Sequence, residues 1–365
     1  MNKRYILVVK TGDAEIRALE NTSMETKEKV FPVIELTRGR KKTLEDNTEV
    51  FPFSNRLKRL KEGLKGLEVA IDATSDSALS SPEIDELYEY GNGYEKWVNL
   101  VCGIKEEGCF KSIIPALIMN FDDPTFEENL KKEIEVLSKH FDSLLYRNSI
   151  EDEYCYTDLP FILSNLPKEK RLLILIDCSY TPQAMENNVS QKLLKRIENF
   201  MTGLVDARCD LAFCATSFPN NISDIGGEDY DEFRISEVSM HKKVYNRFPC
   251  VCYGDYGSVN PKRNDNITMS RGWIPRIDVP LIDKVFYYRQ RRAQRAYVDT
   301  YKEVAKKTVL DAEYPRDLDC WGLRQINYCC TLPPSSSPSY WISVRINIHI
   351  EQQLRRLEQF YAHER

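Results

Sequence analysis

The chain is 365 residues long, with 42% hydrophobic, 11% aromatic and 29% charged residues, a composition typical of globular proteins that excludes a disordered, collagen-like or coiled-coil chain. Its net charge of −5 speaks against general nucleic-acid binding. No segment approaches the roughly 18 apolar residues that span a bilayer, and the N-terminus lacks the long apolar run of a signal peptide. These features predict a cytoplasmic protein that does not bind membranes.

Eight short apolar runs recur along the first 257 residues, and each ends on a polar residue. Their length and β-branched content are typical of strands buried on both faces of a parallel sheet. They start about 35 residues apart on average, which is the size of one strand–helix unit. The runs occupy residues 5–10, 30–35, 67–72, 113–120, 143–148, 172–177, 211–217 and 250–255.

The segments between these runs carry helical periodicity. Leu130, Ile134 and Leu137 recur at spacings of one helical turn, as on one face of an amphipathic helix. Alternating strands and helices predict an α/β fold, a (β/α)8 TIM-barrel-like domain over residues 1–257. The alternative is a doubly wound sheet of six to eight strands. Pro32 and Pro115 count against the boundaries of their strands, because proline cannot donate to a sheet ladder.

Residues 258–365 have a different pattern and are predicted to form a C-terminal helical and hairpin extension. Residues 276–279 and 284–289 are expected to pair as a hairpin, followed by helices near 291–310, 321–330 and 340–360. A linker rich in proline and serine precedes the last helix. The arginine cluster at 289–295 resembles a nucleic-acid patch, or alternatively a helix face that pairs with an acidic barrel. We expect this region to cap the barrel or to bind a partner.

In (β/α)8 barrels the functional groups stand at the C-terminal ends of the strands, where the loops open on one face. Polar residues also mark the points where strands simply leave a core. We predict a ligand site at the mouth of the barrel, formed by the charged and polar strand ends. Its predicted catalytic residues are Lys10, Glu35, Asp72, Asp177 and Asp255, and its predicted ligand-binding residues are Arg147, Asn120, Ser217 and Arg38.

Two kinds of chemistry suit such a ring. Its carboxylates could chelate a hard cation such as Mg²⁺, or one crowded carboxylate with a raised pKa could act as general acid or base. Lys10 and Arg147 would neutralise a phosphate or carboxylate of an anionic small molecule. Arg38 and Arg40 would extend this rim, or form a solvated loop. The histidines and cysteines lack the spacing of a metal site, so no metal ligands are assigned and the cofactor stays unknown.

The N-terminal strand and helix, residues 5–19, and the strand Phe31-Pro-Val-Ile-Glu35-Leu resemble the start of the beta protein family. The resemblance continues at Ser217-Phe218-Pro219, at Gly254-Asp255-Tyr256, at Trp321-Gly322 and from Trp341 to His349-Ile350, so it spans nearly the whole chain. The chain departs from the family pattern at Ile6 and Leu7, where a proline is common.

The resemblance implies a role more than a reaction, because it transfers no catalytic residues. Beta family proteins are encoded in bacterial genomes and prophages, often at loci linked to phage defence and to control of a toxic neighbour. The resemblance therefore implies a component of a phage-defence or toxin–antitoxin-like module that acts through protein or ligand binding, with a protein partner from a neighbouring gene. The alternative is an enzyme that acts on a phosphorylated metabolite or nucleotide at the barrel mouth. Whether the protein is an enzyme stays open.

Overall fold

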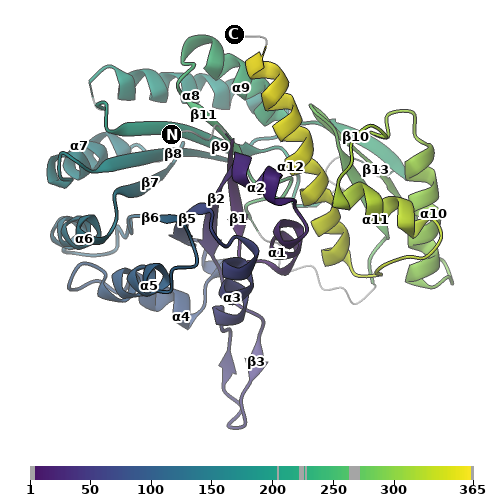
Figure 1. Ribbon diagram of the computed structural model, residues 1–365, viewed down its shortest axis with the longest axis horizontal. Helices are drawn as coiled ribbons and strands as arrows, with labels where there is room; N and C mark the ends of the chain where they lie inside the picture. Colours follow the sequence, from purple (N-terminus) through teal and green to yellow (C-terminus); the bar gives the residue numbers. More distant parts are fainter. Residues whose placement is uncertain (1–4, 204, 222–225, 227, 263–271, 363–365) are drawn as a thin grey trace.

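The computed structural model describes residues 5–203, 205–221, 226, 228–262 and 272–362. Within them, eight parallel strands form one sheet in the order β6-β5-β2-β1-β11-β9-β8-β7 (Figure 1). Starting from β1, the strands follow one another around the sheet as β2, β5, β6, β7, β8, β9 and β11, which is also their order in the chain. The strands are β1 (Tyr5–Lys10), β2 (Val30–Leu36), β5 (Glu68–Ala73), β6 (Ser112–Pro115), β7 (Ser143–Ser149), β8 (Arg171–Tyr180), β9 (Cys209–Thr216) and β11 (Cys252–Asp255).

The two end strands of this sheet, β6 and β7, approach each other and nearly close it into a barrel. The backbone N–H of Leu117 donates to the carbonyl of Leu145 at 2.8 Å, and Ala116 forms a parallel bridge with Leu145. The α/β barrel-like architecture predicted from the sequence is therefore confirmed. The fourth strand is shorter than predicted, since it ends at Pro115 and leaves Asn120 in the following loop.

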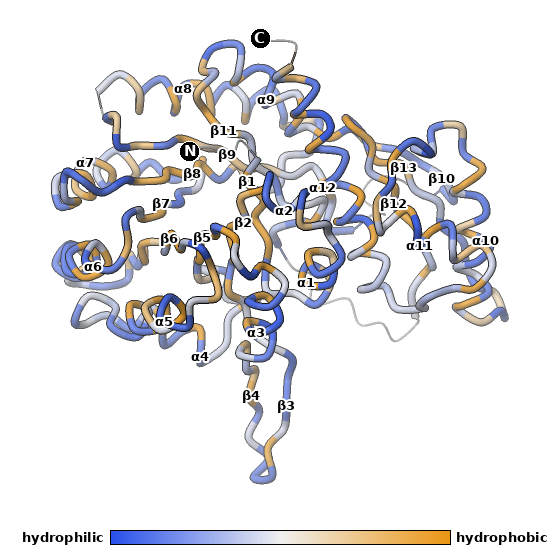
Figure 2. Tube along the Cα trace, viewed as in Figure 1, coloured by the Kyte–Doolittle hydropathy of each residue, from blue (hydrophilic) through white to orange (hydrophobic). Residues whose placement is uncertain are grey.

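Helices cover the outside of the sheet, and their apolar faces point inward. Leu130, Ile134 and Leu137 of α6 are fully buried, as the helical spacing of these residues predicts. Figure 2 shows hydrophobic and hydrophilic residues alternating along α5, α6 and α8. These helices are α1 (Asp13–Glu20), α2 (Met24–Lys29), α3 (Ser54–Gly63), α4 (Pro82–Asp85), α5 (Glu95–Glu106), α6 (Phe126–His140), α7 (Cys155–Asn165), α8 (Glu186–Met201) and α9 (Ser236–Arg247).

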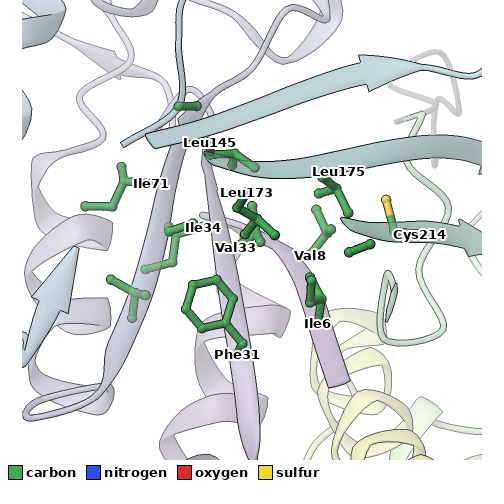
Figure 3. Close-up of a cluster of buried hydrophobic side chains, with 14 of the residues drawn as sticks. Ile6, Val8, Phe31, Val33, Ile34, Ile71, Leu145, Leu173, Leu175 and Cys214 are labelled. Atoms are coloured by element: carbon green, nitrogen blue, oxygen red, sulfur yellow. The ribbon is translucent and has the colours of Figure 1, made fainter. Parts of the chain in front are cut away.

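The interior of the barrel is packed with side chains and is not a pore. Val8, Val33 and Leu173 gather between the strands (Figure 3), and each is at most 3% exposed. Because successive side chains of a strand point to opposite faces, every second residue of a strand fills this interior. A small antiparallel hairpin, β3 (Lys42–Thr43) and β4 (Glu49–Val50), projects from the loop after β2.

The C-terminal region has its own sheet and its own apolar cluster. Its antiparallel strands are β10 (Tyr230–Arg234), β13 (Lys284–Arg289) and β12 (Arg276–Pro280). The predicted hairpin is thus present as β12 and β13. Strand β10 comes from the segment between β9 and α9, so the second sheet draws on both sides of residue 257. Helices α10 (Tyr297–Leu310) and α11 (Trp321–Cys329) pack beside it.

The last helix, α12 (Pro338–Ala362), joins the two parts of the molecule. Ile346 and Ile350 belong to the barrel's apolar cluster, whereas Val344 and Ile348 belong to the C-terminal one. α12 lies on the outside of the barrel between α9 and α1 (Figure 1). Within the described residues, no helix combines the length and apolar composition that crossing a membrane requires.

Candidate functional site

A ring of charged side chains forms the top layer of the barrel interior. Each member lies two residues beyond an apolar inward residue of the same strand, as Lys10 follows Val8 and Glu35 follows Val33. The alternation of strand side chains therefore points the ring inward, at the C-terminal ends of the strands. This charged ring consists of Lys10, Glu35, Asp72, Arg147 and Asp177, and its side chains are 5% to 17% exposed.

Arg147 of β7 lies at the centre of the charged ring. Its Nη1 donates to Glu35 Oε2 at 2.9 Å and to Asp72 Oδ2 at 2.8 Å. Its Nε and Nη2 donate to Asp177 Oδ2 at 3.1 and 2.8 Å. Lys10 Nζ binds the other oxygen of Glu35 at 2.9 Å. The arginine thus ties together strands from opposite sides of the barrel, and its charge is shared among three carboxylates.

Tyr256 completes the charged ring, although the sequence analysis did not select it. Its hydroxyl lies 2.6 Å from both oxygens of Asp177 and accepts a hydrogen bond from Arg147 Nη2 at 3.0 Å. Tyr256 follows β11 directly and is in phase with Gly254, which faces the interior. The Gly-Asp-Tyr-Gly segment drew attention to Asp255, but the register of β11 in the sheet turns Tyr256 toward the interior instead.

The environment drives the pKa values of two neighbouring carboxylates in opposite directions. Burial alone would raise the pKa of Glu35, but Lys10 and Arg147 outweigh it and lower this pKa to about 2. Burial raises the pKa of Asp72, since Arg147 offsets it only partly and Glu35 adds to it. Burial and the charge of Asp177 raise the pKa of Tyr256. Glu35 is therefore firmly ionised, whereas Asp72 holds a proton more readily than an ordinary aspartate.

A cavity of about 440 Å³, here called the mouth cavity, opens above the charged ring. Tyr88, Phe121 and Lys262 contribute to its wall, and the Tyr88 hydroxyl donates to the carbonyl of Ala73 at 2.8 Å. The volume lies in the range typical of small-molecule pockets. Counting described residues alone, five carboxylates line the cavity (Glu35, Asp72, Asp76, Asp152 and Asp177) against three cations (Lys10, Arg147 and Lys262).

Asp255 lies apart from the charged ring although it ends its strand. It is one residue out of phase with Gly254, so its side chain faces the surrounding helices. There it accepts hydrogen bonds from the hydroxyls of Tyr5 and Tyr253 at 3.0 and 2.8 Å, and His349 Nε2 of α12 lies 2.9 Å away. Asp255 is fully buried and does not line the mouth cavity.

Three further residues selected from the sequence lie elsewhere as well. Asn120 donates to the carbonyl of Tyr88 at 3.0 Å, and the backbone N–H of buried Ser217 donates to Glu237 at 2.9 Å. The guanidinium of Arg38 packs over the ring of Phe51, 5.5 Å from its centre. None of these residues contributes to the wall of the mouth cavity. The structure therefore brings together Lys10, Glu35, Asp72, Arg147 and Asp177, and no other residue of the predicted set.

The carboxylates of the charged ring face Arg147 and not a common centre. Among the residues that the structure describes, no three His, Cys, Asp or Glu side chains form a group that could hold a metal ion. A cation bound at the ring would have to compete with the guanidinium for the same oxygens. The arrangement suits hydrogen bonding, charge recognition and proton transfer at Asp72, whose pKa is raised.

Fold and site together define an α/β barrel-like protein with a charged layer and a cavity at its mouth. The family model described as Beta protein matches residues 5–355, and the chain belongs to this family, as its motifs indicate. Over 364 residues it is 25% identical to Protein beta of Enterobacteria phage P4, covering 98% of this chain and 94% of that protein. No solved structure gives a significant match.

Proposed function

We propose that the protein is a binding component of a phage-defence or toxin-control module, and that the mouth cavity is where it holds its ligand or partner. Its family includes a protein of phage P4, which supports a role in the biology of phages and their hosts. We also propose that the fold is a (β/α)8 barrel, in which α12 takes the place of the eighth helix. Barrels of this type carry their functional sites at the C-terminal ends of the strands.

The charged ring is the single observation that carries this proposal. Transferring a charged group from water into a protein interior costs roughly several kcal/mol per ion. A buried ion pair therefore often stabilises a fold no better than apolar residues of similar volume would. Clustered, strongly perturbed ionisable groups in a cavity are typical of functional sites. Arg147 and three carboxylates at the base of the mouth cavity fit that description better than they fit a structural role.

The charge balance of the mouth cavity points to the kind of group it binds. Lys10 and Arg147 are already paired with carboxylates, and carboxylates outnumber cations along the wall. This balance favours an amine or guanidinium, such as a lysine or arginine side chain of a protein partner, over the phosphorylated ligand expected from the sequence. Phe121, 49% exposed, would pack against the apolar stem of such a side chain.

A second candidate is an enzyme that acts at the same mouth. The opposed pKa shifts of Glu35 and Asp72 favour it, because paired carboxylates with separated pKa values are how many active sites divide acid and base roles. Asp72 would then be the proton donor, while Glu35 stays ionised and orients Arg147. Both candidates use the same residues. They differ in whether mutation of those residues abolishes partner binding or only the cellular activity.

The test uses the double variant Asp72→Asn with Asp177→Asn, in tagged protein purified from a bacterial host that carries the neighbouring genes. We expect the wild type to retain a protein partner at fixed stoichiometry in native mass spectrometry, and the variant to lose it while staying folded. An enzyme would instead keep its partner and lose cellular activity. The matched control is Asp142→Asn with Asp319→Asn, two exposed carboxylates. A double variant that keeps both partner and activity would contradict both candidates.

A further inference from the structure

A second cavity, of about 470 Å³, lies between the barrel and the C-terminal region. Its barrel side includes the first turn of α1 and Arg56 of α3, and its far side includes Arg276 of β12 and Arg345 of α12. We call it the basic cavity. Lys10 and Lys262 line both cavities, so the two are neighbours.

The basic cavity has the opposite charge balance to the mouth cavity. Within the described part of the chain its wall has two carboxylates, Asp13 and Glu15, against six cationic side chains. These cations are Lys10, Arg40, Arg56, Lys262, Arg276 and Arg345. Cations brought this close repel one another unless anions lie between them.

Among the described residues, the arginines on each side of the basic cavity share their carboxylate partners. On the C-terminal side, Arg276 Nε lies 2.8 Å from Asp278 Oδ1 and Arg345 Nη1 lies 2.8 Å from Asp278 Oδ2. On the barrel side, Arg40 and Arg56 bind the same oxygen of Asp13, at 3.0 and 3.2 Å. Each pair of guanidiniums therefore shares one aspartate, and Glu15 is the further described carboxylate whose charge acts on Arg345.

Arg345 shows the cost of this arrangement most clearly. Its side chain is 4% exposed, it stacks 3.7 Å above the ring of Phe218, and its Nε–H has no acceptor among the described residues. Burial lowers the pKa of Arg345 to about 10, since Asp278 offsets it only partly and Arg276 adds to it. A buried arginine with an unused donor and a cationic neighbour would be stabilised by an anion.

We propose that the basic cavity binds the phosphoryl group of a small phosphorylated molecule. Guanidinium groups bind phosphate oxygens in bidentate pairs, and Arg56, Arg276 and Arg345 approach the cavity from three different elements. A volume of about 470 Å³ accommodates a molecule of nucleotide size. This site stands independently of the function proposed for the mouth cavity.

The test is isothermal titration of the full-length protein, at low ionic strength, with inorganic phosphate, pyrophosphate and adenosine monophosphate. We expect saturable binding that weakens about tenfold or more in Arg56→Gln and in Arg276→Gln, because each removes a charged hydrogen-bond donor. Arg40→Gln, at a side chain 78% exposed, supplies a variant that does not disturb packing. Tighter binding of the nucleotide than of pyrophosphate assigns the phosphoryl group to an organic molecule, and the reverse assigns it to free phosphate.

The matched control is Arg59→Gln. Arg59 binds the same Asp13 at 3.3 Å and also binds Glu20, but it does not line the basic cavity. We expect its affinity for the probes to stay within about twofold of the wild type, since no ligand contact is lost. Absence of saturable binding for all three probes would overturn the proposal. An equal loss in Arg59→Gln would do the same, because binding would then reflect only the general charge of this surface.

Discussion

Arg147 Nη1 of β7 lies 2.8 Å from Asp72 Oδ2 of β5, and the short strand β6 lies between these two strands. Here the sheet is least complete, since an isolated bridge between Ala116, directly after β6, and Leu145 of β7 takes the place of a strand ladder. The ion pair therefore spans the incomplete part of the barrel wall. One interaction links the position of the charged ring to the closure of the sheet.

Replacing Arg147 with methionine should destabilise the protein by about 3 kcal/mol, because three carboxylates would lose the cation that compensates their burial. Urea unfolding measures this loss of free energy. Arg171→Met is the matched control: Arg171 forms an exposed ion pair with Asp210, whose loss should cost less than about 1 kcal/mol. Equal stability of the two variants would show that the charged ring contributes nothing to closure.

Acid should destabilise the fold through His241. Burial, together with Arg356 and Lys242, lowers the pKa of His241 to about 3, and Arg356 Nη1 lies 3.1 Å from its Nδ1. The unfolded histidine titrates near pH 6.5, so the unfolded state takes up a proton first. Stability contributed by the neutral ring is complete above that pH and falls as the pH drops toward 3. Between pH 6.5 and 4.5 the loss should be about 2 kcal/mol.

Unfolding curves recorded at several pH values check this expectation, with His241→Phe as the comparison. The phenylalanine variant has no group that titrates at this position, so its stability should decline less steeply over the same interval. Parallel slopes for the wild type and the variant would contradict the assignment. Carboxylates whose pKa the fold lowers, such as Glu35 with its pKa of about 2, contribute their own loss only below about pH 4.5. Those whose pKa burial raises, such as Glu237 at about 7, titrate within the interval but act equally in the wild type and the variant, so the difference between the two slopes belongs to His241.

The two faces of α12 should report on the two apolar clusters that it joins. Ile350→Ala removes packing from the barrel cluster and Ile348→Ala from the C-terminal cluster, and each should cost about 2 to 4 kcal/mol. If the clusters unfold together, both variants shift one calorimetric transition. Leu310→Ala, at a side chain 79% exposed, should change little. Two separable transitions would instead mean that α12 does not couple the parts.

A side chain at Gly254 should destabilise the protein, because β11 lies close to the backbones of both neighbouring strands at this residue. A Cβ there would lie 2.7 Å from the carbonyl oxygen of Phe213 and 3.0 Å from that of Ile6. Gly254→Ala should therefore cost about 1 to 3 kcal/mol. Gly103→Ala, in α5 with no atom within 4 Å of the added methyl, should stabilise the protein by about 0.5 to 1 kcal/mol. Thermal unfolding of both variants provides the comparison.

The sequence by itself determined the strand–helix repeat and the family. Uninterrupted apolar runs such as Leu172–Ile176 are informative because a strand buried on both faces must be apolar throughout. It also located most of the charged ring, since Lys10, Glu35 and Asp177 each terminate such a run. The strand predicted at 113–120 was too long, because apolar content continues past Pro115 while hydrogen bonding in the sheet does not.

Only the tertiary structure decided which strand ends share a cavity. Asp255 and Tyr256 are neighbours in the chain, but strand phase turns the first toward α12 and the second toward Asp177, and phase depends on where the sheet register falls. Arg276 and Arg345 lie far from Arg56 in sequence, and no local pattern indicates that they line one cavity. The basic cavity exists because α12 folds back against α1, which is a consequence of long-range packing and not of local propensity.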